Sequence, residues 1–312
     1  MTADADTPPV RVAVAGASGL LGSALVRRLA ADGHTVLRLV RRAPRGADEV
    51  RWDPAAGRVD AAALEGVDAV VNLAGESVAE RWTPARKARI RESREGATRL
   101  LATTLAGLKR KPRVLVNASA VGLYGDRADE RLDETSASGG GFLAEVVREW
   151  EAATAPASAA GIRVVLPRFG VVLSARGGAL AKMLTPFRLG AGGTLGNGSQ
   201  WMSWISLDDA VALMELAIHD ERLAGPVNAV AGAVTNQQFV HTLGHMLSRP
   251  TIVPVPAFAL KLAFGEMAAE TILASQRAEP RVLTQLGYSF IHPELEGALR
   301  AALAEDAEAR SG

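Results

Sequence analysis

The fold is decided by the stretch VAVAGASGLLG, residues 12–22, in which a short apolar run ends in three glycines. A helical pattern of apolar residues follows directly, at Leu25, Val26 and Leu29. Strand, tight turn and helix suit the pyrophosphate of a dinucleotide, because glycine lets the backbone approach the anion and the helix presents free N–H groups. An ordinary turn is the alternative, but the flanking strand and helix are the context that the motif requires. The residues expected to bind the cofactor here are Gly16, Ala17, Ser18, Gly19, Leu20, Leu21 and Gly22.

Composition narrows the class of protein. The 312 residues are 48% apolar, enough for a large core, and the formal charge of +1 gives no general attraction to nucleic acid or membrane. The chain has no cysteine, which excludes disulfides and thiolate catalysis and fits a cytoplasmic protein. Met1 to Pro9 lacks the apolar core of a signal peptide, so we expect a frayed leader there. The expected partner is a small-molecule substrate, with neither nucleic acid nor a membrane.

Apolar runs and helical patterns alternate along the first half, as in a doubly wound parallel sheet. One helix is expected from Thr83-Pro84 to about Leu108 and another over Phe142–Ala159. Further strands are expected at Thr35–Val40, Val67–Asn72, Arg113–Asn117 and Arg163–Leu166. The pattern predicts a Rossmann-type α/β domain over residues 1–173 and about 201–231. A smaller C-terminal substrate lobe is expected over 174–200 and about 232–312.

The end of the second expected strand indicates which nicotinamide cofactor is preferred. An NAD site places an acidic residue there, where it binds the ribose 2′-hydroxyl. This chain has Arg41 and Arg42 instead. A guanidinium binds a 2′-phosphate through paired hydrogen bonds and charge, so we expect NADP(H). The alternative is a pair of solvated arginines at a strand end.

The chain resembles the extended short-chain dehydrogenase/reductases in its glycine loop, the turn Asn72-Leu73-Ala74-Gly75 and the strand-end Ser119. Further segments make it similar to the atypical branch labelled "epimerase family protein", which carries a C-terminal domain of unknown function. They are residues 81–83 with 93–94, 119–125, 142–145, 150–151, 168–173, 192–196, 204–205, 255–258, 265–267 and 286–288. The resemblance spans about Arg11 to Leu303. It implies a Rossmann fold, cofactor contacts from residues 72–75, and a homodimer as one mode of assembly.

The catalytic pair of that superfamily is absent. Most members use Tyr-x-x-x-Lys on a helix, where the lysine lowers the tyrosine pKa toward neutrality. The chain has only two tyrosines, Tyr124 and Tyr288, and neither is followed by a lysine four residues later. The matching helix offers Phe142 and Val146 at the two positions. Other residues must therefore carry any proton transfer.

Four residues could replace the pair. Ser119 ends an apolar strand at the edge where α/β proteins bind ligands, so it could orient a substrate oxygen; otherwise it is a turn serine. Tyr124 follows in the same loop and is our candidate acid or base, with a packing role as the alternative. Glu145 and Glu149 on the matching helix are further proton carriers, although such carboxylates usually only face solvent.

Two residues are expected to contact the substrate. Arg168 follows a proline at a strand end and could bind an anionic or hydroxylated group; the alternative is an ion-pair partner. Trp204 lies in a stretch that alternates as an edge strand would, and could wall the pocket unless it is a core aromatic. The glycine-rich segment 190–198 is expected to form a mobile flap beside them.

No metal is expected. His241 and His245 are spaced i,i+4, but no HExxH pattern or nearby carboxylate accompanies them. The sequence therefore predicts an NADP(H)-dependent oxidoreductase or epimerase acting on a small carbonyl or hydroxyl compound, a sugar nucleotide being one candidate. The alternative is a non-catalytic NADP(H)-binding regulator or redox sensor, for which the missing pair is evidence.

Overall fold

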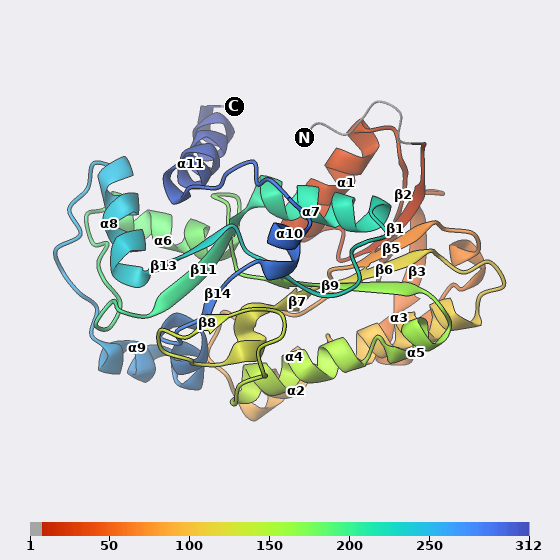
Figure 1. The fold of residues 1–312 in the computed structure, drawn as a ribbon, viewed down its shortest axis with the longest axis horizontal. Helices are drawn as coiled ribbons and strands as arrows, with labels where there is room; N and C mark the ends of the chain where they lie inside the picture. Colours follow the sequence, from red (N-terminus) through yellow and green to blue (C-terminus); the bar gives the residue numbers. More distant parts are fainter. Residues whose placement is uncertain (1–7, 312) are drawn as a thin grey trace.

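The chain forms a parallel sheet with helices on both faces and a smaller lobe at one end (Figure 1). The computed structural model describes residues 8–311, so nearly all of the expected leader lies outside it. Every strand pair of the main sheet is parallel except β3 with β4, which confirms the predicted α/β class. In spatial order the strands are β12 (Gly225–Ala229), β9 (Arg163–Phe169), β6 (Val114–Asn117), β5 (Ala69–Asn72), β1 (Arg11–Ala15), β2 (Thr35–Val40), β3 (Glu49–Asp53) and β4 (Arg58–Val59), while β7 (Ser119–Ala120) pairs with β9.

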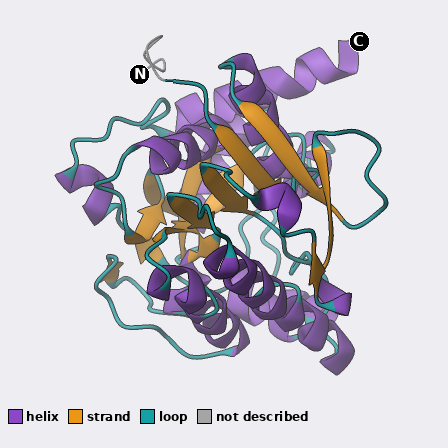
Figure 2. Cartoon of the chain, turned by 90° about the vertical axis from the view of Figure 1, so that its right-hand side faces the viewer, coloured by secondary structure: helices purple, strands orange, loops and turns teal. Residues whose placement is uncertain are grey.

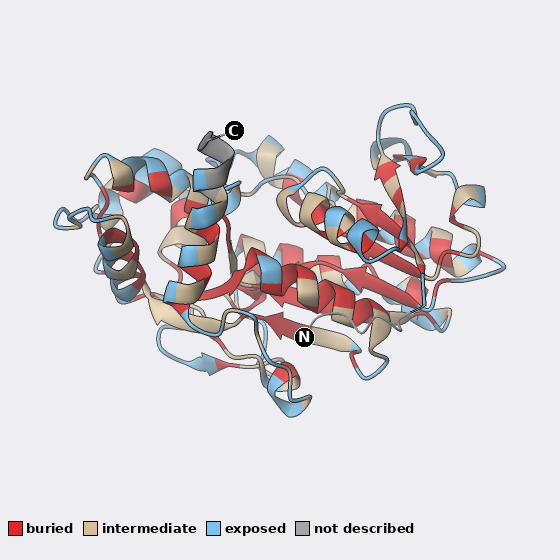
Figure 3. Ribbon diagram, turned by 90° about the horizontal axis from the view of Figure 1, so that it is seen from above, coloured by how far each residue is buried: buried red, intermediate tan, exposed pale blue. Residues whose placement is uncertain are grey.

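Two layers of helices cover this sheet, whose central strands β9, β6, β5 and β1 are buried (Figure 3). One layer holds α1 (Leu20–Ala31), α7 (Leu207–His219) and α10 (Arg281–Gln285), and the other holds α2 (Pro84–Glu92), α3 (Glu95–Gly107), α4 (Phe142–Ala152) and α5 (Ala155–Ala159). Each long helix expected on the second layer is broken into two. The first breaks at Ser93, whose hydroxyl accepts the Glu76 N–H, and the second breaks just ahead of Pro156.

The lobe has its own three-stranded sheet, and Figure 2 shows strands of the chain with helices on both sides. The strands of the lobe are β10 (Val171–Leu173), β11 (Trp201–Ser206) and β13 (Gly232–Thr235), of which the last two are labelled in Figure 1. The helices of the lobe are α6 (Gly178–Arg188), α8 (Asn236–Met246), α9 (Ala257–Phe264) and α11 (Leu295–Ser311). A small pair, β8 (Arg131–Leu132) with β14 (Arg277–Ala278), lies nearby, and short 3-10 turns occupy Pro54–Ala56, Ala62–Leu64 and Val121–Tyr124. The chain returns to the main domain at Leu207, not at 201 as expected, because β11 pairs with β10 and β13. Residues 281–290 also return, since Leu283 is buried in the core of the main domain.

Side chains near the π-helical turn η4 (Ala268–Ile272) tie the lobe to the main domain. The Glu270 carboxylate accepts the first two N–H groups of α4, from Phe142 at 3.0 Å and Leu143 at 2.8 Å. Arg81 donates to the carbonyl of Leu262 at the end of α9 (2.8 Å). The lobe is therefore fastened to the same helix that carries the catalytic pair in related enzymes.

The glycine-rich segment 190–198 is not a free flap. The Val255 N–H donates to the Thr194 carbonyl at 2.8 Å, and the Gly196 N–H donates to the Val255 carbonyl at 2.9 Å. Gly193 is buried so closely that a Cβ would lie 1.8 Å from the Val253 carbonyl oxygen. Backbone pairing with a distant segment, which composition does not reveal, fixes the loop. No helix in the described part of the chain is long and apolar enough to cross a membrane.

Candidate active site

The glycine turn after β1 sits against the turn after β5. Gly16 adopts φ +76°, and a Cβ on it would lie 2.7 Å from the Leu73 carbonyl. A Cβ on Gly22 would lie 2.1 Å from the Gly16 carbonyl oxygen. Both glycines are therefore required for close backbone packing. This contact lies between β1 and β5, where the strand order reverses and α/β folds bind ligands.

The first turn of α1 has free N–H groups. Its N-cap, Gly19, has no side chain to accept them, and no acidic residue lies in the first turn. Ser18 and Gly19 are exposed, whereas Ala17, Leu20 and Leu21 pack against the core. The backbone of the predicted loop is thus open to an anion while its apolar side chains anchor the helix. This cradle fits a dinucleotide pyrophosphate.

A buried amide shapes the turn after β5. Asn72 donates from Nδ2 to Thr98 Oγ1 at 2.8 Å and to Asn117 Oδ1 at 2.7 Å. Its Oδ1 accepts the N–H of Ala74 at 3.3 Å. Because the Asn72 side chain is fully buried, it positions residues 73–75 and does not reach a ligand itself.

A guanidinium flanks the same turn. Arg94 donates to the carbonyls of Glu76 (2.9 Å) and Ile90 (3.2 Å) and lies 5.2 Å from the Trp150 ring centroid. A Cβ on Gly75 would lie 3.2 Å from its Cζ atom. Burial lowers the pKa of Arg94 to about 10, so it stays charged at neutral pH. The turn therefore carries a positive charge that the sequence analysis did not assign to the site.

The two arginines after β2 have different surroundings. Arg42 donates to both oxygens of Glu49 at 2.6 Å, and these bonds lower the pKa of Glu49 to about 2. Arg41 is exposed and makes no hydrogen bond or ion pair with any described residue. Arg41 is thus the guanidinium that remains available to a 2′-phosphate, while Arg42 is already paired.

Ser119 belongs to a buried chain of polar groups at the carboxyl edge of the sheet. Its Oγ donates to Glu151 Oε1 at 2.5 Å. Arg168 holds the same carboxylate with two hydrogen bonds, Nε to Oε1 at 2.9 Å and Nη2 to Oε2 at 3.0 Å. The pairing of β7 with β9 sets Ser119 opposite Arg168. Ser119 and Arg168, which the sequence predicts separately, thus both bond to Glu151. The Glu151 side chain is more exposed than that of Arg168.

Tyr124 supports this chain from inside the core. Its hydroxyl accepts from Arg168 Nη1 at 3.0 Å and has Asn228 Oδ1 (2.7 Å) and the Asp133 carbonyl (2.9 Å) as acceptors. The ring is fully buried, and burial raises the pKa of its phenol. The expectation that Tyr124 itself exchanges a proton with substrate does not fit this position. Tyr124 instead positions Arg168.

The place of the usual Tyr-Lys pair is filled by apolar packing. Phe142 and Val146 share a cluster with Trp82, Ile90 and Met267. The Phe142 and Trp82 rings meet edge to face with centroids 5.0 Å apart. No acid–base chemistry can start from these side chains, so the structure agrees with the absence that the sequence indicates.

The alternative proton carriers lie on the outer side of α4. Glu145 is exposed and Glu149 is partly exposed. Arg91 pairs with Glu149 at 2.8 Å and approaches Glu145 at 3.5 Å. These carboxylates neutralise a basic helix and lie outside the buried chain of Ser119.

Trp204 lies in the core of the lobe. It is on β11, the central strand of the small sheet and not an edge strand, and its indole is almost wholly buried against Gly232. The expected pocket wall is therefore a packing residue, because it shares the core of the lobe with Leu180, Phe187 and Phe239. His241 and His245 lie on α8, and the described residues contain no group of three potential metal ligands.

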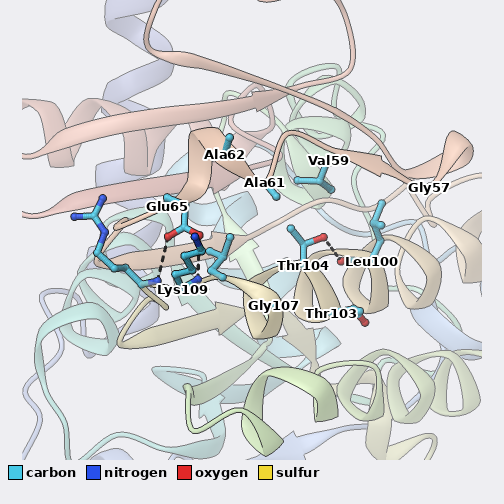
Figure 4. Close-up of a pocket in the computed structure, with 12 residues that line it drawn as sticks. Gly57, Val59, Ala61, Ala62, Glu65, Leu100, Thr103, Thr104, Gly107 and Lys109 are labelled. Carbon is cyan, nitrogen blue, oxygen red and sulfur yellow. Dashed lines mark hydrogen bonds between the residues drawn. The ribbon is translucent and has the colours of Figure 1, made fainter.

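A cavity lies elsewhere in the main domain (Figure 4). It has a volume of about 770 Å³ and lies between the 3-10 turn at Ala62–Leu64 and α3, near the amino ends of β5 and β6. Its carboxylate, Glu65, accepts the backbone N–H groups of Lys109 (2.9 Å) and Arg110 (3.0 Å). This cavity lies away from the glycine turn and from the Ser119 chain at the carboxyl edge, and its acid is already bound to two backbone N–H groups.

Two residues of the buried chain, Glu151 and Asn228, are not predicted as site residues from the sequence. A signal existed for Asn228, because a polar residue inside the apolar run of β12 needs a buried partner. Glu151 lies in a segment shared with the family but carried no comparable signal of its own, since helix carboxylates are common.

The strand order and the glycine cradle define a Rossmann-type dinucleotide-binding protein. The model of the NAD dependent epimerase/dehydratase family matches residues 12–230, and that of a domain of unknown function, DUF1731, matches residues 255–302. The chain therefore belongs to the NAD dependent epimerase/dehydratase family, as the resemblance implied.

Similar proteins share nearly the whole chain. An epimerase family protein of Mycobacterium bovis is 47% identical over 92% of this chain and 96% of its own. The crystal structure of human epimerase family protein SDR39U1 with NADPH is 34% identical, covers 94% of this chain and 98% of its own, and gives a TM-score of 0.85. A nucleoside-diphosphate sugar epimerase from Corynebacterium glutamicum is 38% identical, with a TM-score of 0.76, and covers 98% of this chain and 62% of its own.

Proposed function

We propose that this protein is an NADP(H)-dependent oxidoreductase or epimerase that acts on a small carbonyl or hydroxyl compound. The glycine cradle supports binding of the pyrophosphate, and the unpaired Arg41 supports a 2′-phosphate over a 2′-hydroxyl. The human relative at 34% identity is crystallised with NADPH, which supports the same choice. The two turns at residues 16–22 and 72–75 would hold the dinucleotide.

One observation carries the catalytic part of the proposal: Ser119 donates to a carboxylate that Arg168 fixes with two bonds. The bound cofactor would supply hydride transfer to or from a substrate carbon. In oxidation, Ser119 would orient the substrate hydroxyl, accept its proton and donate its own proton to Glu151. In reduction, the same protons would move in the opposite direction, from Glu151 through Ser119 to the substrate oxygen. Arg168 holds the carboxylate in place with two hydrogen bonds, and Tyr124 keeps Arg168 in place.

A sugar nucleotide is the substrate class we favour. The similar protein from Corynebacterium glutamicum is described as a nucleoside-diphosphate sugar epimerase. The charged Arg94 beside Gly75 suits an anionic substrate. An epimerase would oxidise the sugar transiently and return the hydride to its other face, whereas a reductase would release product and oxidised cofactor.

The proposed function is tested by measuring first cofactor binding and then turnover. Calorimetric titration with NADPH and NADH should show a clear preference for NADPH. A panel of sugar nucleotides and simple carbonyls, followed by NADPH absorbance and by product stereochemistry, should then reveal turnover. Ser119→Ala and Glu151→Gln should each lower turnover about 100-fold or more with unchanged NADPH affinity.

The rival function makes the opposite prediction. The apolar packing at Phe142 and Val146 favours a non-catalytic NADP(H)-binding regulator or redox sensor. Tight NADPH binding with no turnover on any compound of the panel would support the sensor. Absence of binding to either nucleotide would overturn both functions.

We also propose a homodimer, as the resemblance implies, assembled through α2 and α3, and a location in the cytoplasm, which the lack of cysteine supports. Light scattering after gel filtration tests the assembly. A mass of one chain, 32.6 kDa, at micromolar concentration would contradict it.

A further inference from the structure

The outer surface of the lobe displays large apolar side chains in solvent. We name this surface the α9 face. Its members, with their exposed fractions, are Leu189 (79%), Ile252 (83%), Val253 (68%), Phe258 (73%) and Leu262 (75%). Such a concentration of exposed apolar side chains on one lobe marks an interaction site.

Backbone contacts make these side chains one surface. The segment before α9 is bridged to residues 194–196 through Val255, and a Cβ on Gly196 would lie 3.7 Å from Ala257. Arg249 donates from Nε to the carbonyl of Arg188 at 2.9 Å, which places Leu189 beside the same segment. On α9, Phe258 and its i+4 neighbour share one side, while Leu260 is buried on the other.

Acidic residues are sparse in the segments that form this surface. No aspartate or glutamate occurs between Glu151 and Asp208, or between Glu221 and Glu266. Of the basic lobe residues in these spans, Arg188, Arg249 and Lys261 lie within three residues of members of the face, whereas Arg176 pairs with Glu305 and Lys182 donates to the Ala79 carbonyl. The acids that follow α9 face the main domain: Glu266 pairs with Lys87, and the next one, in η4, is bound to the start of α4. The α9 face is thus apolar and basic.

We propose that the α9 face binds the surface of an anionic lipid bilayer. Protruding apolar side chains can enter the interface of a bilayer while neighbouring lysine and arginine contact anionic headgroups. A second copy of the chain suits the face poorly, because an isologous contact would place Lys261 and Arg249 near their own counterparts. The expectation of no membrane partner rested on the formal charge of +1 and on the lack of a spanning segment. Binding at the interface needs no spanning segment, and it depends on the charge of the local surface and not on that of the whole chain.

Vesicle co-sedimentation of the full chain tests this proposal. The probes are vesicles of pure phosphatidylcholine and vesicles in which about one third of the lipid is phosphatidylglycerol. Binding to the anionic vesicles should be about 10-fold stronger and should fall as salt rises. Phe258→Ser combined with Leu262→Ser should reduce binding about 10-fold or more, and Lys261→Glu about 5-fold or more. Ile291→Ser, which removes an exposed apolar side chain elsewhere, is the matched control and should bind like the wild type.

Other outcomes overturn the proposal. Equal binding to both kinds of vesicle would remove the role of the basic residues. No binding to either, with a dimer in light scattering that the double serine variant abolishes, would make the α9 face a self-interface. Thermal unfolding of each variant, followed by circular dichroism, shows whether a variant that does not bind vesicles is still folded. NADPH titration of the double variant keeps this test separate from that of the cofactor site.

Discussion

Two regions at the carboxyl edge of the main sheet, the cofactor half and the catalytic half, differ in whether their hydrogen-bonding groups are free or already bonded. At the cofactor half, the turn at Gly16 and the uncapped start of α1 present backbone N–H groups to solvent. At the catalytic half, Ser119, Glu151 and Arg168 are bound to one another beneath the surface. A pyrophosphate needs only backbone donors, so its site tolerates change in side chains. Proton transfer needs particular side chains, and the set that we propose here differs from the usual pair.

The largest effect is expected on NADPH affinity, from a substitution that fills the space at the glycine turn. Gly16→Val would place a side chain against the Leu73 carbonyl and strain a backbone at φ +76°, so NADPH affinity should fall about 100-fold or more. Calorimetry measures the loss. Gly33→Val is the matched control, since Gly33 has φ +82° but open space around it. If both variants bind NADPH equally well, the glycine turn is not the cofactor cradle.

A smaller effect is expected in the catalytic half. Tyr124→Phe removes one acceptor from Arg168 and the donor to Asn228 Oδ1, while the carboxylate keeps both arginine bonds. Turnover should fall about 10-fold, as expected for one hydrogen bond to a charged group, with NADPH affinity unchanged. A loss as large as that of Glu151→Gln would restore Tyr124 as the acid or base.

The two adjacent arginines after β2 allow a comparison within the cofactor half, because only one of them is ion-paired to a residue that the structure describes. Arg41→Ala should weaken NADPH binding about 10-fold and leave NADH binding nearly unchanged. Arg42→Ala is the matched control and should have less effect, because Arg42 is committed to Glu49. Equal losses for NADPH and NADH in the Arg41 variant would refute the 2′-phosphate assignment.

The smallest expected effect is on the free energy of unfolding, and it comes from the buried carboxylate of Glu215. Unlike Glu151, Glu215 is not bonded through both of its oxygens to any arginine that the structure describes. On α7, burial and a hydrogen bond with Asp32 raise the pKa of Glu215 to about 6. Its raised pKa stabilises the native state at low pH, and this contribution is lost as pH rises from about 4.5 through 6. Glu215→Gln should therefore gain about 1 kcal/mol of unfolding free energy over the wild type between pH 4 and pH 7. Urea unfolding at several pH values measures it, and a pH-independent difference would contradict it.

The cofactor half was predictable because its signals are local. A strand, three glycines and a helix lie within about twenty residues, and the two arginines end the next strand. The α/β class of the sheet follows from the same kind of local signal, the alternation of strand and helix. The catalytic half joins Tyr124 to Asn228 across 104 residues and to Arg168 across 44. Nothing in a single sequence pairs such positions until the strand order is known.

Alternation misled the interpretation of Trp204 for a related reason. A strand with polar residues between aromatic ones can lie at an edge or between two short neighbours, and the pattern is the same in both. Here β10 and β13 flank it, and the tryptophan is buried in the core of the lobe. The helix breaks at Ser93 and before Pro156 were likewise hidden, because each depends on a side chain or a ring acting on a continuous helical pattern.

The carboxylate of Glu270 at the start of α4 has a consequence for how the protein unfolds. It stands where an N-cap side chain would, yet it comes from 128 residues further along the chain. Freeing the lobe would leave the first turn of α4 uncapped and the Phe142 cluster without Met267. The two parts should therefore melt in a single cooperative transition. A chain cut before α9 would lose stability in the main domain as well.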